Sequence, residues 1–143
     1  MSTTGTVLQA YVENRKKHNP SNIFDEKAYS CNKSGEICWD VSDKRDFEYN
    51  HTLSEAIQLF NESLSSQSYI DAHAWCFTPS SFRLIIQDLI ELNIIRMKEF
   101  SFDDTSFCEF FVQLRKNSSF QKRNRKEMIK LIEWELHQQS VII

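Results

Sequence analysis

Glycine and proline are scarce in this chain of 143 residues, which contains only two of each. A phosphate-binding loop needs several glycines close together, and an all-β fold needs many tight turns, which these two residue types favour. The sequence also lacks the G-x-G-x-x-G, Walker, G-x-S-x-G and H-E-x-x-H motifs. The composition therefore argues against an all-β protein and a nucleotide-binding loop, and no motif completes a catalytic apparatus.

Long apolar runs and cysteine patterns are also missing. No run of about 18 apolar residues occurs, and the first residues show neither a secretory signal nor a transit pattern. The four cysteines are scattered, which does not indicate a disulfide framework. Cys31 and Cys38 could join a histidine in a zinc site, but their spacing is not that of a zinc knuckle and no second close pair follows. We expect a cytoplasmic protein with no metal site, no cofactor held by this chain alone and no membrane segment.

Charge is distributed unevenly over a chain whose apolar fraction is 41% and whose net charge is −3. From Arg115 onward, seven basic residues stand against three acidic ones, a balance of +4, which leaves −7 for residues 1–114. The basic stretch KRNRK at 122–126 could bind nucleic acid or anionic lipid. Because the body is acidic and no aromatic residues interleave the stretch, we interpret it as a solvated helix face or a linker to another module and expect no nucleic-acid partner.

Helical spacing of apolar residues and local capping signals predict a largely helical chain. Thr52 and Glu55 form a capping-box pattern, and Thr78 with Pro79 marks another helix start. Asn93 is suited to a helix end because asparagine tolerates the left-handed conformation. The predicted helices cover about 4–17, 22–30 after a cap at Ser21, 53–64, 79–92 and 119–138.

Two strands are predicted after the fourth helix, at 94–102 and 107–114, with a turn at 103–106 between them. The first is half polar, as an edge strand is. The second is almost entirely apolar, so we predict that it is buried on both faces and has a neighbour on its far side. The chain offers no third strand for that place. Residues 31–50 are expected to form a polar loop around an apolar patch at 37–39.

An aromatic segment at 69–77 precedes the helix that starts after Thr78. Its pattern predicts an extended chain, so His73 and Trp75 would share one face just before a helix N-terminus, where backbone N–H groups can bind an anion. His73 could act as a general base or as a hydrogen-bonding group for a substrate, and Asp71 on the same face could orient its imidazole. The alternative is a structural histidine, partly buried, that bonds a backbone carbonyl.

Two stretches, HAWCFTPSSFRLIIQDLIELNII (73–95) and CEFFVQLRK (108–116), carry a resemblance to a known family. Two more, STTGTVLQAYVENRKKHNPSNIFDEKAYSC (2–31) and HTLSEAIQLFNESL (51–64), extend it. The chain resembles the C-terminal part of a bacterial family of class I, S-adenosylmethionine-dependent methyltransferases, which are often found near or fused to glycosyltransferases. The resemblance covers about residues 2–116.

The resemblance implies the architecture of two segments. Residues 1–72 would be a helical insertion that covers the acceptor site, and 73–116 the helix and two strands that end the family's seven-stranded sheet. In that ending, the last strand lies antiparallel beside the fifth. The third segment, 117–143, lies beyond the resemblance, and its own pattern predicts a basic amphipathic helical tail. The first five strands, the cofactor loop and the acidic ribose-binding residue lie upstream in the family. The fold class would be α/β for the whole enzyme and α+β for this chain in isolation.

The same resemblance implies a function associated with glycan biosynthesis. We expect the acceptor-covering portion of a methyltransferase, inactive alone, whose partner is an upstream half or another protein that supplies the S-adenosylmethionine site. His73, Trp75 and Tyr29, with Asp71, would face the methyl acceptor. The family often has a histidine where this chain has Glu26. The alternative is a non-catalytic interaction module that docks a partner chain through its sheet edge and its basic C-terminal helix.

Overall fold

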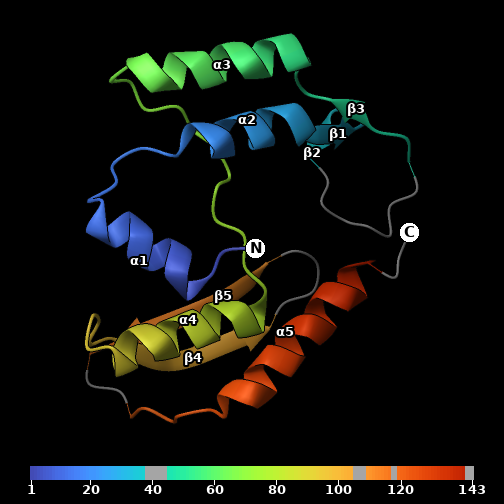
Figure 1. The fold of residues 1–143 in the computed structure, drawn as a ribbon. Helices are drawn as coiled ribbons and strands as arrows, with labels where there is room; N and C mark the ends of the chain where they lie inside the picture. Colours follow the sequence, from blue (N-terminus) through green and yellow to red (C-terminus); the bar gives the residue numbers. More distant parts are fainter. Residues whose placement is uncertain (38–44, 105–108, 117–118, 141–143) are drawn as a thin grey trace. The chain divides into compact units, whose positions relative to one another are not determined.

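The computed structural model describes residues 1–37, 45–104, 109–116 and 119–140 (Figure 1). These residues form a mixed α/β fold with two small antiparallel sheets. No helix among them combines the length and the hydropathy that a membrane span requires. The helices are α1 (Thr4–Val12), α2 (Pro20–Tyr29), α3 (Leu53–Ser65), α4 (Pro79–Glu91) and α5 (Arg125–Ser140), and the strands are β1 (Cys31–Lys33), β2 (Glu36–Ile37), β3 (Glu48–Tyr49), β4 (Lys98–Asp104) and β5 (Phe110–Arg115).

The chain divides into two compact units. One comprises residues 10–76 and contains α2, α3 and the sheet of β1, β2 and β3. The other comprises residues 1–9 together with 77–143 and contains α4, α5, β4 and β5. Thr4 joins the N-terminal residues to this second unit, because its hydroxyl donates a 2.7 Å hydrogen bond to Asp88 of α4. The three segments expected from the sequence divide the chain linearly, whereas the contacts bring residues 1–9 to the C-terminal half.

Helix α1 ends at Val12, so the predicted continuation to residue 17 is wrong. Asn14 adopts a left-handed conformation with φ 49°, and the N–H of Arg15 donates to the carbonyl of Ala10 (3.0 Å). This is the bond of a Schellman motif, in which a left-handed residue satisfies the last carbonyls of a helix and turns the chain away. Asn14 therefore ends the helix five residues before Asn19.

Helix α2 starts at Pro20 with Asn19 as its N-cap, so the predicted cap at Ser21 is wrong. Proline is favoured at the first helical position because the N–H that it lacks would have no partner there. Helices α2 and α3 pack against each other. The rings of Phe24 and Phe60 meet edge to face between them, with centroids 6.4 Å apart. This helix pair forms the centre of the unit of residues 10–76.

The region 31–50, predicted to be a polar loop, contains a small three-stranded sheet in the order β2-β1-β3. Ser34 and Gly35 join β1 to β2 and have φ values of 57° and 82°. Two consecutive positive φ values match the right-handed twist of a hairpin, and Gly35 accepts its value at no steric cost because it has no Cβ. The loop prediction is therefore wrong for β1, β2 and β3. Cys38 and Trp39 of the predicted apolar patch lie outside the described residues.

Both predicted helix starts with local capping signals are confirmed. In α3, the Thr52 hydroxyl accepts the Glu55 N–H (3.2 Å) while the Glu55 carboxylate accepts the Thr52 N–H (2.7 Å). The bond from the Thr52 N–H and a second from the Thr52 hydroxyl to the carboxylate (2.9 Å) lower the pKa of Glu55, because both favour its charged form. Thr78 caps α4 in the same reciprocal way, with Ser81 as the returning partner (2.8 Å). Two helices therefore start where their own side chains satisfy the free backbone N–H groups.

The predicted end of α4 is also confirmed. Asn93 has φ 58°, and the next N–H, that of Ile94, donates to the carbonyl of Leu89 (2.9 Å), which is again a Schellman bond. The residues after Asn93 thus close the helix, and β4 begins at Lys98 rather than at residue 94.

Strands β4 and β5 form an antiparallel pair with one irregularity, an extra residue in β4 at Phe100 between Glu99 and Ser101. Asp103 and Asp104 pair within the sheet, so the prediction that they open a turn is wrong. Residues 105–108, which contain the rest of the predicted turn and Cys108, lie outside the described residues.

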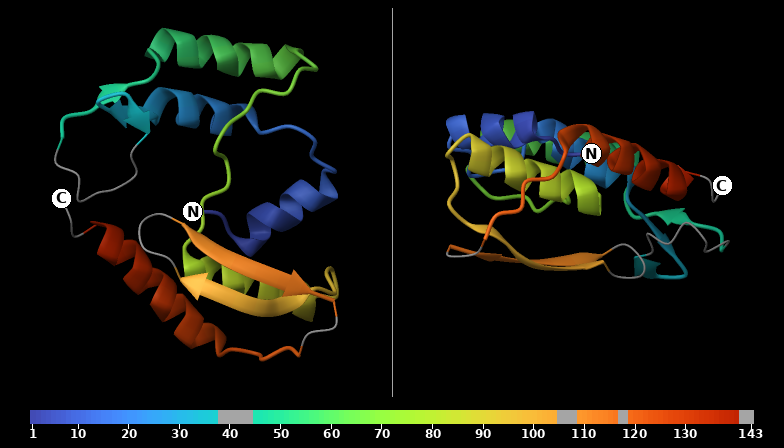
Figure 2. Two further views of the ribbon diagram at one scale, coloured as in Figure 1. Left: turned by 180° about the vertical axis from the view of Figure 1, so that it is seen from behind. Right: turned by 90° about the horizontal axis from the view of Figure 1, so that it is seen from below.

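The prediction that strand β5 is buried on both faces is wrong. Half-buried and exposed residues alternate along it. Phe110 lies on the half-buried face, with its ring centroid 5.7 Å from that of Phe82 in α4. Phe111 points to the other face and is 59% exposed. Figure 2 shows α4 lying over one face of the pair, and in this unit no described helix covers the other.

Helix α5 begins at Arg125, not near residue 119. Asn124 supplies the start, because its side-chain oxygen accepts the Lys126 N–H (2.9 Å). Met128 and Ile132, two of the predicted apolar positions, are buried, and α5 packs against α4. The other two predicted positions, Leu131 and Leu136, are 47% and 37% exposed. The apolar surface of α5 is therefore wider than the face that α4 covers.

Candidate functional site

The four predicted substrate-binding residues lie in the unit of residues 10–76. Tyr29 is the last residue of α2 and is 66% exposed, and Trp75 is 41% exposed. Asp71 and His73 are also exposed, in a segment without regular secondary structure. The Ala74 N–H donates to the carbonyl two residues earlier (2.8 Å), which makes His73 the centre of a γ-turn. This turn interrupts the uniformly extended backbone that the sequence predicted.

Asp71 belongs to a hydrogen-bonded chain with Tyr69 and His18. The Tyr69 hydroxyl lies 3.2 Å from Asp71 Oδ1 and 2.8 Å from His18 Nε2. An ionised carboxylate only accepts, so the hydroxyl donates to Asp71, and its oxygen is left to accept from the Nε2–H of His18. No sequence pattern indicates these two hydrogen bonds, because His18 and Tyr69 are 51 residues apart and neither stands in a local motif.

Replacing Asp71 with asparagine is expected to move the pKa of Tyr69 down, towards the ordinary tyrosine value of about 10. The pKa of Tyr69 is raised first by the loss of solvent around its hydroxyl and then by the hydrogen bond and charge of Asp71. The asparagine removes the charge and leaves the other cause in place. A spectrophotometric pH titration of tyrosine absorbance measures the change, and a Tyr69→Phe variant assigns the transition. An unchanged curve would contradict the contact.

Two further hydrogen bonds hold the segment that carries His73 and Trp75. Lys17 Nζ donates to the carbonyl of Ser66 (2.6 Å), and Asn22 Nδ2 donates to the carbonyl of Ala74 (3.3 Å). With the bond from His18 to Tyr69, they tie residues 66–74 to residues 17–22 of the same unit. The segment therefore has a defined course despite its lack of helix or strand.

The N-terminus of α4, proposed from the sequence as a place where an anion could bind, is occupied by the carboxylate of Glu135. Ser80 donates to Glu135 of α5 from its N–H (3.1 and 3.2 Å) and from its hydroxyl (2.6 Å). A carboxylate is favoured at this place because the first N–H groups of a helix carry partial positive charge. The expectation that this helix start is open to a ligand is therefore wrong.

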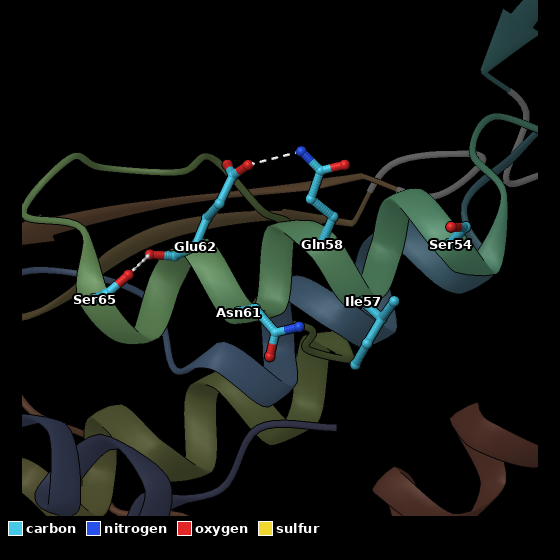
Figure 3. Close-up of a pocket in the computed structure, with 6 residues that line it drawn as sticks. All are labelled: Ser54, Ile57, Gln58, Asn61, Glu62 and Ser65. Carbon is cyan, nitrogen blue, oxygen red and sulfur yellow. Dashed lines mark hydrogen bonds between the residues drawn. The ribbon is translucent and has the colours of Figure 1, made fainter.

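A hollow of about 520 Å³ lies along α3 (Figure 3). Within it, Gln58 donates a 2.9 Å hydrogen bond to Glu62. Every lining residue comes from this one helix, so no second element encloses a ligand, unlike the clefts that bind small molecules. None of the four predicted site residues contributes to it. The lining consists of Ser54, Ile57, Gln58, Asn61, Glu62 and Ser65.

The basic stretch 122–126 is largely neutralised by α4 and β4 of its own unit. Lys122 pairs with Glu91 (2.8 Å), Arg123 with Glu99 (2.7 Å) and Arg125 with Asp88. An external polyanion would have to compete with these carboxylates, which reduces the attraction that the sequence alone suggests.

The described residues contain no group of three or more histidine, cysteine, aspartate or glutamate side chains placed to hold a metal ion. Cys31 and Cys76 are not joined in a disulfide, and Cys38 lies outside the described residues.

Comparison with protein-family models, with curated proteins and with solved structures finds no match to this chain.

Proposed function

We propose that the chain is the acceptor-covering, C-terminal portion of a class I S-adenosylmethionine-dependent methyltransferase and works with a separate cofactor-binding half. The observation that carries the proposal is the free edge of β5. After α4, the chain forms an antiparallel pair in which β5 has β4 on one side and no strand of the described residues on the other. In the family that the sequence resembles, the fifth strand occupies that second side.

The exposed face of the same strand pair adds support. Phe100 and Phe111 are 49% and 59% exposed on the side away from α4, which costs free energy because large apolar side chains are more stable out of water. A complete sheet covered by helices on both faces would bury them. The sequence predicts burial of β5 on both faces, which this chain alone does not provide. The proposed cofactor-binding half would supply the strand and helices that cover it.

The described residues do not fit S-adenosylmethionine by themselves. The hollow on α3 is open and lined by one helix, and the start of α4 is taken by Glu135. We therefore assign no cofactor contact to this chain. Its part is to contact the methyl acceptor, with Tyr29, His73 and Trp75 as the contacting residues. His73 would accept a proton where the acceptor is a hydroxyl or an amine, and positioning of the acceptor would supply most of the acceleration.

Isothermal titration of the chain with S-adenosylmethionine tests the first part of the proposal. We expect no binding up to about millimolar ligand, since an affinity in the micromolar range, about −8 kcal/mol, requires a formed site. Micromolar binding would contradict the assignment as a half without a cofactor site. Thermal unfolding followed in the same samples serves as the control that the titrated chain is folded.

Sequencing the DNA upstream of the coding region tests the second part. A reading frame there that encodes a glycine-rich strand-turn-helix would supply the missing half. When the two products are mixed, we expect the complex to bind S-adenosylmethionine and the β5 amides to become protected from hydrogen exchange. In that complex, His73→Gln should impair methyl transfer, whereas Gln58→Ala on α3 should not. If other amides became protected from hydrogen exchange in the complex but those of β5 did not, the proposed pairing would be refuted.

A non-catalytic interaction module is the second candidate function. The observation that favours it is the width of the apolar surface on α5, where Leu131 and Trp134 are 47% and 59% exposed beside the buried Met128 and Ile132. Exposed apolar side chains grouped on one helix mark protein contacts more often than scattered ones do. If a Trp134→Lys variant binds the same partner proteins as the wild-type chain with the same affinity, this candidate is refuted.

A further inference from the structure

The two outer edges of the β4 and β5 pair differ in their capacity to accept another strand. β4 carries the extra residue at Phe100 and the charged side chains of Lys98, Glu99 and Asp103. Bulges and charges of this kind prevent edge pairing in natural sheets. β5 has no extra residue, no proline and a single charge, that of Arg115. The free edge of β5 is therefore the one that remains open to a strand.

We propose that β5 pairs with β5 of a second copy of this chain, antiparallel and about a two-fold axis at Val112. In this register Phe110 lies opposite Leu114 of the other copy, and Phe111 lies opposite Gln113. Each pair occurs twice because the interface is the same patch on both subunits. Partners in this register differ by an even number of positions, so both lie on the same face of the sheet. The half-buried face therefore continues across the axis.

Charge complementarity supports this register. Glu109, exposed immediately before β5, lies opposite Arg115 of the other copy, and the pair also occurs twice. The Arg115 guanidinium stacks over the Phe100 ring of β4 at 3.4 Å, so it must turn away from that ring to meet Glu109 of the other copy. Directly opposed unlike charges stabilise an antiparallel pair, and like charges destabilise it. A shift of the axis to Phe111 or Gln113 would remove both Glu109 and Arg115 pairs.

The inference does not rest on the methyltransferase proposal, because edge pairing requires only the free strand. The two proposals are nevertheless connected, because both use the same edge of β5. A cofactor-binding half that supplies a fifth strand would use the same edge of β5, so it would replace the second copy, and the two assemblies would exclude each other.

Charge reversals test the pairing in the full chain. Sedimentation velocity over a concentration series should show a monomer-dimer equilibrium for the wild type. Arg115→Glu and Glu109→Arg each place like charges opposite each other twice, so each should raise the dimer dissociation constant about tenfold. The double variant E109R/R115E restores the opposed charges and should recover wild-type association. When the two single variants are mixed, native mass spectrometry should show the heterodimer in excess over both homodimers.

Two controls separate the interface from general effects. Asp103→Lys changes the net charge as much as Glu109→Arg does, but on the β4 side, and should leave the equilibrium unchanged. Arg115→Lys keeps the charge while it alters the stack on Phe100, and should retain the dimer; circular dichroism establishes that each variant is folded. A wild-type chain that stays monomeric up to about millimolar concentration would overturn the inference. A dimer that the reversals do not weaken, or that the double variant does not restore, would overturn it as well. None of these outcomes changes the expected titration with S-adenosylmethionine.

Discussion

Replacement of Gln87 by leucine is expected to lower the free energy of unfolding of its unit by about 3 kcal/mol. Gln87 lies on α4 and is 1% exposed. Its side chain forms two hydrogen bonds with the backbone of Arg123: Nε2 donates to the carbonyl (3.0 Å), and Oε1 accepts the N–H (2.8 Å). Leucine has a similar volume and no polar atom, so both backbone groups would lose their partner in a partly buried place, at about 1–3 kcal/mol each.

Urea denaturation followed by circular dichroism measures this loss, with hydrogen exchange of the α4 and α5 amides to assign it to the unit. Gln121→Leu is the matched control. It makes the same chemical change at an exposed position of the same segment, where we expect an effect within about 0.5 kcal/mol. Equal effects of the two variants would show that the bonds to Arg123 contribute no specific stability.

Replacement of Glu99 by glutamine is expected to cost about 2 kcal/mol at neutral pH. The Glu99 carboxylate accepts two hydrogen bonds from Arg83 (2.9 and 2.7 Å) and one from Arg123 (2.7 Å). It thereby joins α4, β4 and the segment before α5. Glutamine keeps the shape but leaves two guanidinium groups without a counter-charge. The figure is set below that of a fully buried pair because these side chains retain contact with water.

The effect of Glu99 should depend on pH in a defined direction. Burial raises the pKa of Glu99, but the hydrogen bond and charge of Arg83, and then of Arg123, outweigh it, and the net pKa is lowered. A carboxyl whose pKa is lower in the folded state stabilises the fold above its unfolded value of about 4.3 and loses that contribution as pH falls through the folded value. The difference between wild type and Glu99→Gln should therefore be full at pH 7 and shrink below pH of about 4.

Glu91→Gln is the control for Glu99. The Glu91 carboxylate pairs with Lys122, whose side chain is 64% exposed, and exposed pairs contribute little to stability. We expect a change within about 0.5 kcal/mol. If the Glu99→Gln deficit persisted undiminished in acid, the ion pairs with Arg83 and Arg123 would not be its cause.

Features that the sequence predicted correctly are those in which a few neighbouring residues decide the structure. The capping pairs of Thr52 and Thr78 satisfy backbone groups three residues away, and Asn93 closes α4 through the residue that follows it. Local residues also decide the end of α1 and the first hairpin, where Asn14 and Ser34 adopt left-handed conformations. The information for both turns therefore lies within a few residues of the chain.

Other features depend on residues that are distant along the chain and could not be predicted in this way. Burial of β5 depends on which layers cover it, and composition alone does not reveal whether those layers belong to the chain. At the candidate site, the bond between His18 and Tyr69 and the seat of Glu135 on Ser80 join residues more than 50 positions apart. The predicted residues Tyr29, Asp71, His73 and Trp75 fall in one unit, and their role as acceptor contacts stays a prediction.

Two polar contacts between α5 and α4, one near each end of the shared interface, fix how far the helices pack along each other. Asp88 meets Arg125 near the start of α5, and Ser80 meets Glu135 farther along. The two helices run antiparallel between these points, over spans of about 12 and 15 Å at 1.5 Å per residue. A shift of α5 by one turn along its axis would break both polar contacts at once and move Met128 and Ile132 out of their buried positions. The axial position of α5 is thus fixed at two points.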